Sequence, residues 1–162
     1  MKIAPACIAL VLISCVVHAQ TSDTSKTPDT AKPAVPANTT APVKKTVSEI
    51  FDWNKMQITP TATGERRLLI NGPTATVDKL DCHITTLKPG EKSGEPSKHL
   101  QEEIIIVKEG SLEANYDGHA QVVGPGSVIY FAAGATTFLR NAGTTPVTYT
   151  VIYYITPLTP KS

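Results

Sequence analysis

The stretch that decides the fold runs from residue 88 to residue 110 and reads KPGEKSGEPSKHLQEEIIIVKEG. A Pro-Gly turn and a polar loop lead to a single histidine, and a run of β-branched residues then ends at a glycine. Alternate residues of a strand point to opposite faces, so this run should place Glu103, Ile105 and Val107 on one face and Ile104 and Ile106 on the other. Since both faces carry isoleucine, we expect this strand to be covered on both sides.

The spacing of turns around this stretch is typical of an all-β protein. Strand-like segments alternate with turns that contain glycine or proline, and no helix-period segment longer than about ten residues interrupts them. The segments are residues 66–72, 74–87, 99–109, 111–116, 119–123, 127–131, 136–141 and 147–155. The pair Asp117-Gly118 between two of them predicts a type I′ hairpin. About eight strands in one domain predict a jelly roll or sandwich.

The first 19 residues have the pattern of an export signal. The apolar stretch from Ile3 to Val17 is shorter than the roughly 20 residues that a membrane-spanning helix needs. Val17 and Ala19 stand at the −3 and −1 positions of a cleavage after Ala19, which predicts a secretory signal peptide and a secreted or periplasmic protein. An alternative is a lipoprotein, because the residues that end at Cys15 resemble a lipobox.

Residues 20–46 differ from the rest in composition. They contain no aromatic residue and are dominated by Thr, Pro, Ala and Lys. Such a segment cannot bury enough apolar surface to offset its ordering entropy, which predicts a disordered linker. The expected organisation is therefore a signal peptide over 1–19, this linker, and one folded domain over 47–160.

Charge and cysteine content narrow the function classes. The formal net charge is +1, from 15 basic and 14 acidic residues, and no block of one sign gives the basic face that a nucleic-acid binder needs. Cleavage after Ala19 leaves Cys82 as the only cysteine, so an internal disulfide is excluded. Because Cys82 lies in a strand-like run, we expect a buried and inert thiol.

Residues 89–143 resemble the cupin superfamily, whose members are small jelly-roll (RmlC-like) β-barrels. The first cupin motif is Pro-Gly, a loop, His-x-His, three or four residues, Glu, six residues and Gly. Here Pro89-Gly90 opens the motif, and Glu103 and Gly110 close it. His99 stands at the second histidine position, and Ser97 takes the place of the first histidine.

The second cupin motif keeps its frame but not its ligand. It reads GSVIYFAAGATTFLRN, from Gly126 to Asn141, with Ala132 in place of a proline. Thr137 stands where the motif has a histidine. Two of the four metal-ligand positions that the resemblance implies are therefore replaced by neutral hydroxyls.

The replaced positions weaken the expectation of a metal. Divalent iron, manganese, nickel or zinc prefers imidazole and carboxylate ligands at about 2.0–2.2 Å, and hydroxyls are poor ligands at neutral pH. His99 and Glu103 are the remaining candidate ligands, and our first expectation is that no metal is bound. If His83 also points inward, two histidines and one carboxylate would give an alternative metal site.

The sequence favours a binding protein and leaves an enzyme open. The first hypothesis is an exported single-domain cupin with a degenerate metal site, which binds an unknown small molecule or serves a structural role. Its ligand-binding candidates are Ser97, Gln101, Thr137 and Asn141. The alternative is a cupin enzyme of dioxygenase or isomerase type that uses His99, Glu103 and His83.

A metal-free enzyme and a dimer are further expectations. His99 would act as general base, with Glu103 orienting it, and the acid would be an inward-facing tyrosine from the set Tyr130, Tyr149 and Tyr153. His119 follows the Asp117-Gly118 turn, so we expect it to face solvent. The resemblance also implies a homodimer that forms through sheet faces or edges.

Overall fold

The computed structural model describes residues 45–161. The predicted signal peptide, the lipobox at Cys15 and nearly all of the predicted linker lie outside these residues and remain predictions. Within residues 45–161 the only helical element is the 3₁₀ turn η1 (Trp53–Lys55), and no helix is long and apolar enough to cross a membrane.

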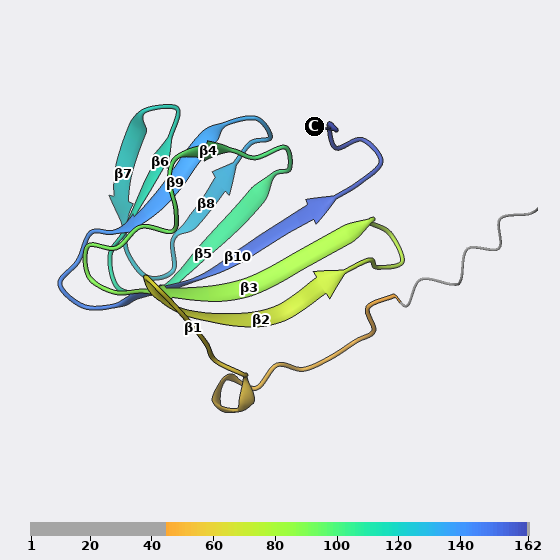
Figure 1. Ribbon diagram of the computed structural model, residues 1–162, viewed down its shortest axis with the longest axis horizontal. Coiled ribbons are helices and arrows are strands. Elements are labelled where there is room, and N and C mark those ends of the chain that lie inside the picture. Colours follow the sequence, from red (N-terminus) through yellow and green to blue (C-terminus); the bar gives the residue numbers. More distant parts are fainter. Residues whose placement is uncertain (1–44, 162) are drawn as a thin grey trace, which may run out of the picture. The chain divides into compact units, whose positions relative to one another are not determined.

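Ten strands form two antiparallel sheets in the described chain. The six-stranded sheet has the order β1-β2-β3-β10-β5-β8 and the four-stranded sheet the order β4-β9-β6-β7. Figure 1 shows them as two layers, with β4, β6, β7 and β9 on one side. The larger sheet contains β1 (Thr59–Thr61), β2 (Gly64–Gly72), β3 (Lys79–Leu87), β5 (Glu103–Glu109), β8 (Val128–Phe131) and β10 (Val147–Ile155), and the smaller sheet contains β4 (Ser97–Lys98), β6 (Leu112–Tyr116), β7 (His119–Val123) and β9 (Thr136–Asn141).

The predicted all-β jelly roll is confirmed, and each of the eight predicted segments contains a strand. The sequence pattern missed β1 and β4, which have three and two residues and are too short to show alternation. It also began one strand five residues early, at residue 74 instead of Lys79. The hydroxyl of Thr74 accepts hydrogen bonds from the backbone N–H groups of Thr76 and Val77, which holds this segment in a turn.

The predicted hairpin between β6 and β7 is also confirmed. Asp117 and Gly118 have φ angles of 47° and 84°, and a type I′ turn needs a positive φ at both central residues. The hairpin exposes His119, as expected, and its imidazole lies 5.5 Å from the ring of Tyr116.

The hydrophobic core lies between the two sheets. Alternate residues of the long strands face inward, so Ile105 and Val107 of β5 are fully buried, as predicted, and pack with Val147, Tyr149 and Val151 of β10. Leu112, Ala114 and Leu139 supply the facing layer from the smaller sheet. Burial of these apolar side chains stabilises the packing of one sheet against the other.

The outer face of β5 is covered only in part, which corrects the prediction of cover on both sides. The ring of Trp53 lies under two cations, with Lys108 Nζ 3.1 Å and Arg67 Cζ 4.6 Å from its centroid. Farther along the same face, Ile106 is 39% exposed. The segment before β1 therefore covers one end of the outer face through a single aromatic ring.

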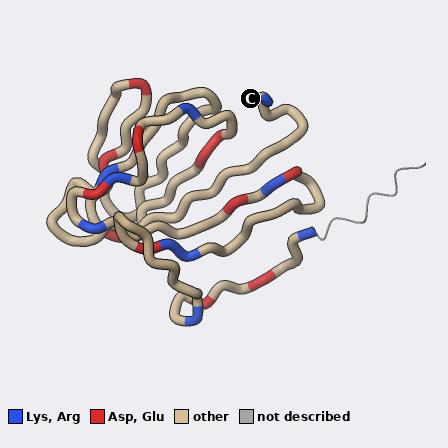
Figure 2. Tube along the Cα trace, in the orientation of Figure 1, with Lys and Arg blue, Asp and Glu red and all other residues tan. Residues whose placement is uncertain are grey.

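Charges of both signs are mixed over the described chain. Figure 2 shows Lys and Arg residues interspersed with Asp and Glu residues along the strands and the loops. The described surface thus has the mixed character that the balanced composition predicts.

Gly110 closes the turn between β5 and β6, and its lack of a side chain is required in two ways. Its φ is +83°, and a Cβ atom placed on it would lie 2.7 Å from the backbone of Pro146 and Val147. Gly118 has nearly the same φ, but nothing lies within 4 Å of a Cβ there. Substitutions at the two glycines therefore distinguish the cost of backbone strain from the cost of a steric clash.

We expect Gly118→Ala to lower the free energy of unfolding by about 1 kcal/mol, because only the left-handed backbone is penalised. Gly110→Ala should lower it by about 1–3 kcal/mol more, because the added methyl group also displaces the strand β10. Chemical denaturation of both variants measures the difference. Equal losses would show that the clash is relieved without cost.

Candidate functional site

The inner face of the larger sheet carries a patterned set of side chains. The register of β3, β10 and β5 aligns Asp81 with Tyr153 and Tyr153 with Glu103. One row further, His83 is aligned with Val151, and beyond it Thr85 lies between Arg66 of β2 and Tyr149 of β10. Neighbouring strands are about 4.8 Å apart, so each row brings groups from two to four strands together.

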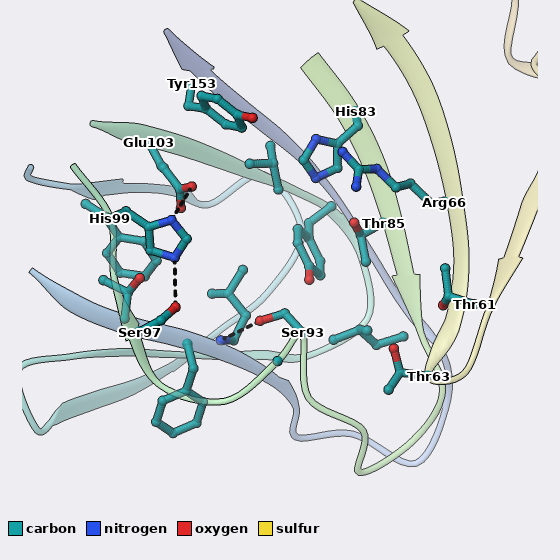
Figure 3. A pocket seen from close by; sticks show the side chains of 18 of the residues that line it. Thr61, Thr63, Arg66, His83, Thr85, Ser93, Ser97, His99, Glu103 and Tyr153 are labelled. Carbon is teal, nitrogen blue, oxygen red and sulfur yellow. Dashed lines mark hydrogen bonds and ion pairs between the residues drawn. The ribbon is translucent and has the colours of Figure 1, made fainter. Parts of the chain in front are cut away.

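These rows form one wall of a cavity of about 450 Å³ between the two sheets. The opposite wall comes from β9 and from the chain around β4, which together contribute Ser93, Ser97 and Thr137. Figure 3 shows Arg66 and His83 on one side of this space and Ser97, His99 and Glu103 on the other. The volume lies within the range of small-molecule sites.

Five of the predicted site residues line this cavity. They are Ser97, His99, Gln101, Glu103 and Thr137. His83 lines it as well, so its side chain points inward, which sequence parity alone left undecided. Tyr149 and Tyr153 also contribute to the lining, whereas Tyr130 lies on the outer face and is 61% exposed.

Asn141 does not line the cavity and holds the fold together instead. Its side-chain amide donates hydrogen bonds to the backbone carbonyl groups of Leu87 and Thr145, at 3.0 and 2.8 Å. Its side-chain oxygen accepts a hydrogen bond from the backbone N–H of Gly143 at 2.9 Å. With these groups satisfied inside the protein, Asn141 has a structural role at the position where we predicted ligand binding.

His99 is the centre of a polar network on one side of the cavity, where the segment after β4 meets Glu103 of β5. Its Nδ1 lies 3.4 Å from Glu103 Oε1 and 3.5 Å from Gln101 Nε2, and its Nε2 lies 3.2 Å from Ser97 Oγ. Burial raises the pKa of Glu103, and the nearby His99 opposes this shift. Both ring nitrogens of His99 therefore have neighbours within its own segment.

The second histidine of the cavity, His83 on β3, makes a shorter contact with a buried carboxylate, which the sequence reasoning missed. His83 Nδ1 lies 2.6 Å from Asp81 Oδ1, and Asp81 is only 1% exposed. Arg66 Nη2 lies 3.7 Å from the same carboxylate oxygen. Residues 81 and 83 share strand parity, and this was the signal from which the pair could have been found.

The pair leaves one ring nitrogen of His83 available. With Nδ1 on Asp81, Nε2 has no hydrogen-bond partner among residues 45–161. Burial lowers the pKa of His83, and the hydrogen bond to Asp81 opposes this shift. The neutral imidazole, with a basic nitrogen free to meet a ligand, is thus the favoured form near neutral pH.

The donor groups do not fit a transition-metal site. Within residues 45–161 no three or more His, Cys, Asp or Glu side chains are grouped so that they could hold a metal ion. Ser97 and Thr137 are direct partners in the β4–β9 register, so the two replaced ligand positions lie side by side as hydroxyls. His83, His99 and Glu103 therefore do not form the alternative two-histidine, one-carboxylate set.

Cys82 lies away from the cavity. It alternates with Asp81 and His83 on β3 and is half-buried on the outer face of the sheet. Burial, and to a lesser degree Asp81, raises the pKa of its thiol, which disfavours the reactive thiolate.

A two-sheet jelly roll with a polar cavity between its layers defines the class of protein, and comparison with known families agrees. Residues 83–153 match the family described as the Cupin domain. Residues 83–153 thus form a cupin domain. No protein of curated function matches it significantly by sequence.

Solved cupin structures share the fold at low sequence identity. An RmlC-like cupin from Shewanella frigidimarina is 18% identical with a TM-score of 0.55, covering 68% of this chain and 95% of that one. A cupin-superfamily sugar phosphate isomerase from Silicibacter pomeroyi is 22% identical with a TM-score of 0.54, covering 67% and 77%. The polyketide cyclase RemF from Streptomyces resistomycificus is 18% identical with a TM-score of 0.56, covering 67% and 80%. At these identities the likeness establishes the fold alone.

The Asp81–His83 pair predicts a distinct titration. We expect His83 to titrate below the ordinary value of 6.5, and Asp81→Asn to lower its pKa further, because the variant removes the group that favours the charged ring. Since the folded pKa lies below the unfolded one, the contribution of His83 to stability is present above pH 6.5 and is lost as the pH falls through the folded pKa. Imidazole NMR measures the titration.

The exposed His119 on the β6–β7 hairpin is the internal control, because its imidazole NMR signals should be the same in the wild type and in Asp81→Asn. A pKa of His83 that rises in Asp81→Asn would contradict the assigned contact.

Proposed function

We propose that the protein is an exported cupin that binds a small polar molecule in this cavity without a resident transition metal. The observation that carries the proposal is the pair of neutral hydroxyls, Ser97 and Thr137, which face each other across β4 and β9 beside the His99–Glu103 pair. A cupin with histidine at both positions would offer three imidazoles and one carboxylate at the motif positions, and this chain offers only His99 and Glu103 there.

The arrangement of His99 supports a binding role. Its Nε2 has a hydrogen-bond partner in Ser97, and its Nδ1 has Gln101 and Glu103 as neighbours, so both ring nitrogens can be satisfied without an ion. Such a network can exchange one internal hydrogen bond for a bond to a ligand, which suits recognition of a polar molecule.

The proposal of export rests on the sequence of residues 1–19. A cleaved signal peptide would leave a secreted or periplasmic protein, and lipidation of Cys15 would leave an anchored one. Residues 20–46 would then connect the cavity-containing domain to its leader or anchor.

The metal content of the purified protein tests the proposal directly. After loading with iron, manganese, nickel or zinc and desalting, we expect the tag-free wild type to retain no more metal than a blank. The double variant Ser97→His with Thr137→His should retain close to one ion per chain, because it completes the ligand set. The double variant therefore shows that the assay can detect a cupin metal site in this fold.

Stoichiometric metal in the wild type that disappears in His99→Ala would contradict the proposal. It would instead favour the metal-dependent alternative with His99 and Glu103 as ligands.

The Asp81–His83 pair favours a second candidate function, which is metal-independent proton transfer. A buried carboxylate fixes the imidazole through Nδ1, and the free Nε2 can accept a proton from a bound carbon or oxygen acid. Glu103 and Tyr153 lie one row away and could return a proton. In this candidate His83, not His99, is the base, since both nitrogens of His99 already have neighbours.

Ring opening of 5-nitrobenzisoxazole is a test that needs no natural substrate. A base removes the ring C–H proton, the N–O bond breaks, and its electron pair leaves on the phenolate oxygen. We expect saturable ring opening that falls roughly 100-fold or more in His83→Gln, in line with the loss of a positioned base. The exposed His119→Gln should leave the rate unchanged, and equal rates in both variants would exclude His83 as the base.

A further inference from the structure

The cavity combines several hydroxyl groups with charged groups that lie close to one another. Six serine and threonine side chains line it from both sheets, and they are Thr61, Thr63, Thr85, Ser93, Ser97 and Thr137. A hydroxyl can donate and accept a hydrogen bond, so it matches a ligand hydroxyl in either direction. The lining therefore fits a ligand that carries several hydroxyl groups.

The charged and titratable groups at the cavity lie close to one another. Arg66 has the buried carboxylate of Asp81 at 3.7 Å, and Glu103 has His99 at 3.4 Å. At the rim, Glu65 pairs with Arg67 at 3.4 Å, and Glu95 is exposed to water. A charged ligand would thus have to compete with these existing contacts for a partner of opposite sign in the enclosed part of the site.

Burial makes a charge expensive in this space. Tyr149 is about 1% exposed, and burial raises the pKa of its hydroxyl, so an anionic oxygen without a cationic partner is disfavoured at this point of β10. An ion that leaves water without gaining a partner loses much of its hydration energy. A neutral ligand loses only hydrogen bonds to water, which the hydroxyl lining can replace.

Apolar side chains complete the fit. Phe131, Leu87 and Val151 line the cavity together with the hydroxyls, and they would contact the C–H groups of a carbon chain or ring. Polar groups on the ligand would meet the walls, and its carbon skeleton would meet these side chains.

We infer that the ligand of the cavity is an uncharged, hydroxyl-rich small molecule, and that the site discriminates against its carboxylate, phosphate and ammonium counterparts. The inference rests on the proposed binding function and adds the chemical class of the ligand.

Four probes with one carbon skeleton test the inference. They are sorbitol, gluconate, sorbitol 6-phosphate and 1-amino-1-deoxysorbitol, which differ in a single terminal group. Titration of the ¹⁵N-labelled wild type should move the amide resonances of cavity residues such as Thr85 and Thr137 with sorbitol. The three charged probes should bind at least about tenfold more weakly, as expected for unpaired charges in a buried site.

Matched variants locate the binding and test the role of charge pairing. Thr85→Val should weaken the binding of sorbitol roughly three- to tenfold, because one hydrogen bond is lost. Thr150→Val, on the outer face of the same sheet between Ile84 and Ile106, should have no effect. Asp81→Asn removes the counter-charge of Arg66 and should shift the preference toward gluconate.

The outcomes separate the inference from the proposal beneath it. A charged probe that binds the wild type as tightly as sorbitol overturns the inference and leaves small-molecule binding in place. If none of the four probes moves a cavity resonance at its highest soluble concentration, both the ligand class and the binding function fail.

Discussion

The strand β10 is the element on which the other features depend. Its nine residues pair with β3 along one edge and with β5 along the other, so it fixes the register of the central sheet. Its inward residues Val147, Tyr149 and Val151 belong to the core, and Tyr153 continues the same face into the polar cavity. Strand alternation admits no other placement, because a slip by one residue would move all of these side chains to the outside.

The same register explains why the two histidines of the cavity differ in their exposure and in their partners. His83 lies in the middle of a long strand, and its partner Asp81 lies two residues earlier on the same face, where water is excluded. His99 follows the two-residue strand β4 and is 36% exposed as a side chain, and its neighbours come from nearby in the sequence. The Asp81–His83 pair is therefore better shielded from water than the His99–Glu103 pair.

The sequence predicted the fold well because it contains long strands, clear turns and a cupin frame. It also identified Ser97, His99, Gln101, Glu103 and Thr137, all of which the structure places at one cavity. The sequence was a poor guide where a motif position has a structural role. Asn141 occupies a motif position, but its amide donates hydrogen bonds to the backbone of Leu87 at the end of β3 and of Thr145 in the β9–β10 turn. Asp81 was missed because parity assigns residues 81 and 83 to one face without saying whether that face is inside.

The register pair Ser97–Thr137 has a consequence for how such a domain can change over time. Both positions that would carry the missing imidazoles lie on one two-residue bridge at the edge of the smaller sheet. None of the side chains that hold the sheets together lies on β4, which is exposed. The strand β4 can thus carry different side chains while the scaffold stays the same, so the fold alone does not determine the reaction or ligand of a particular member.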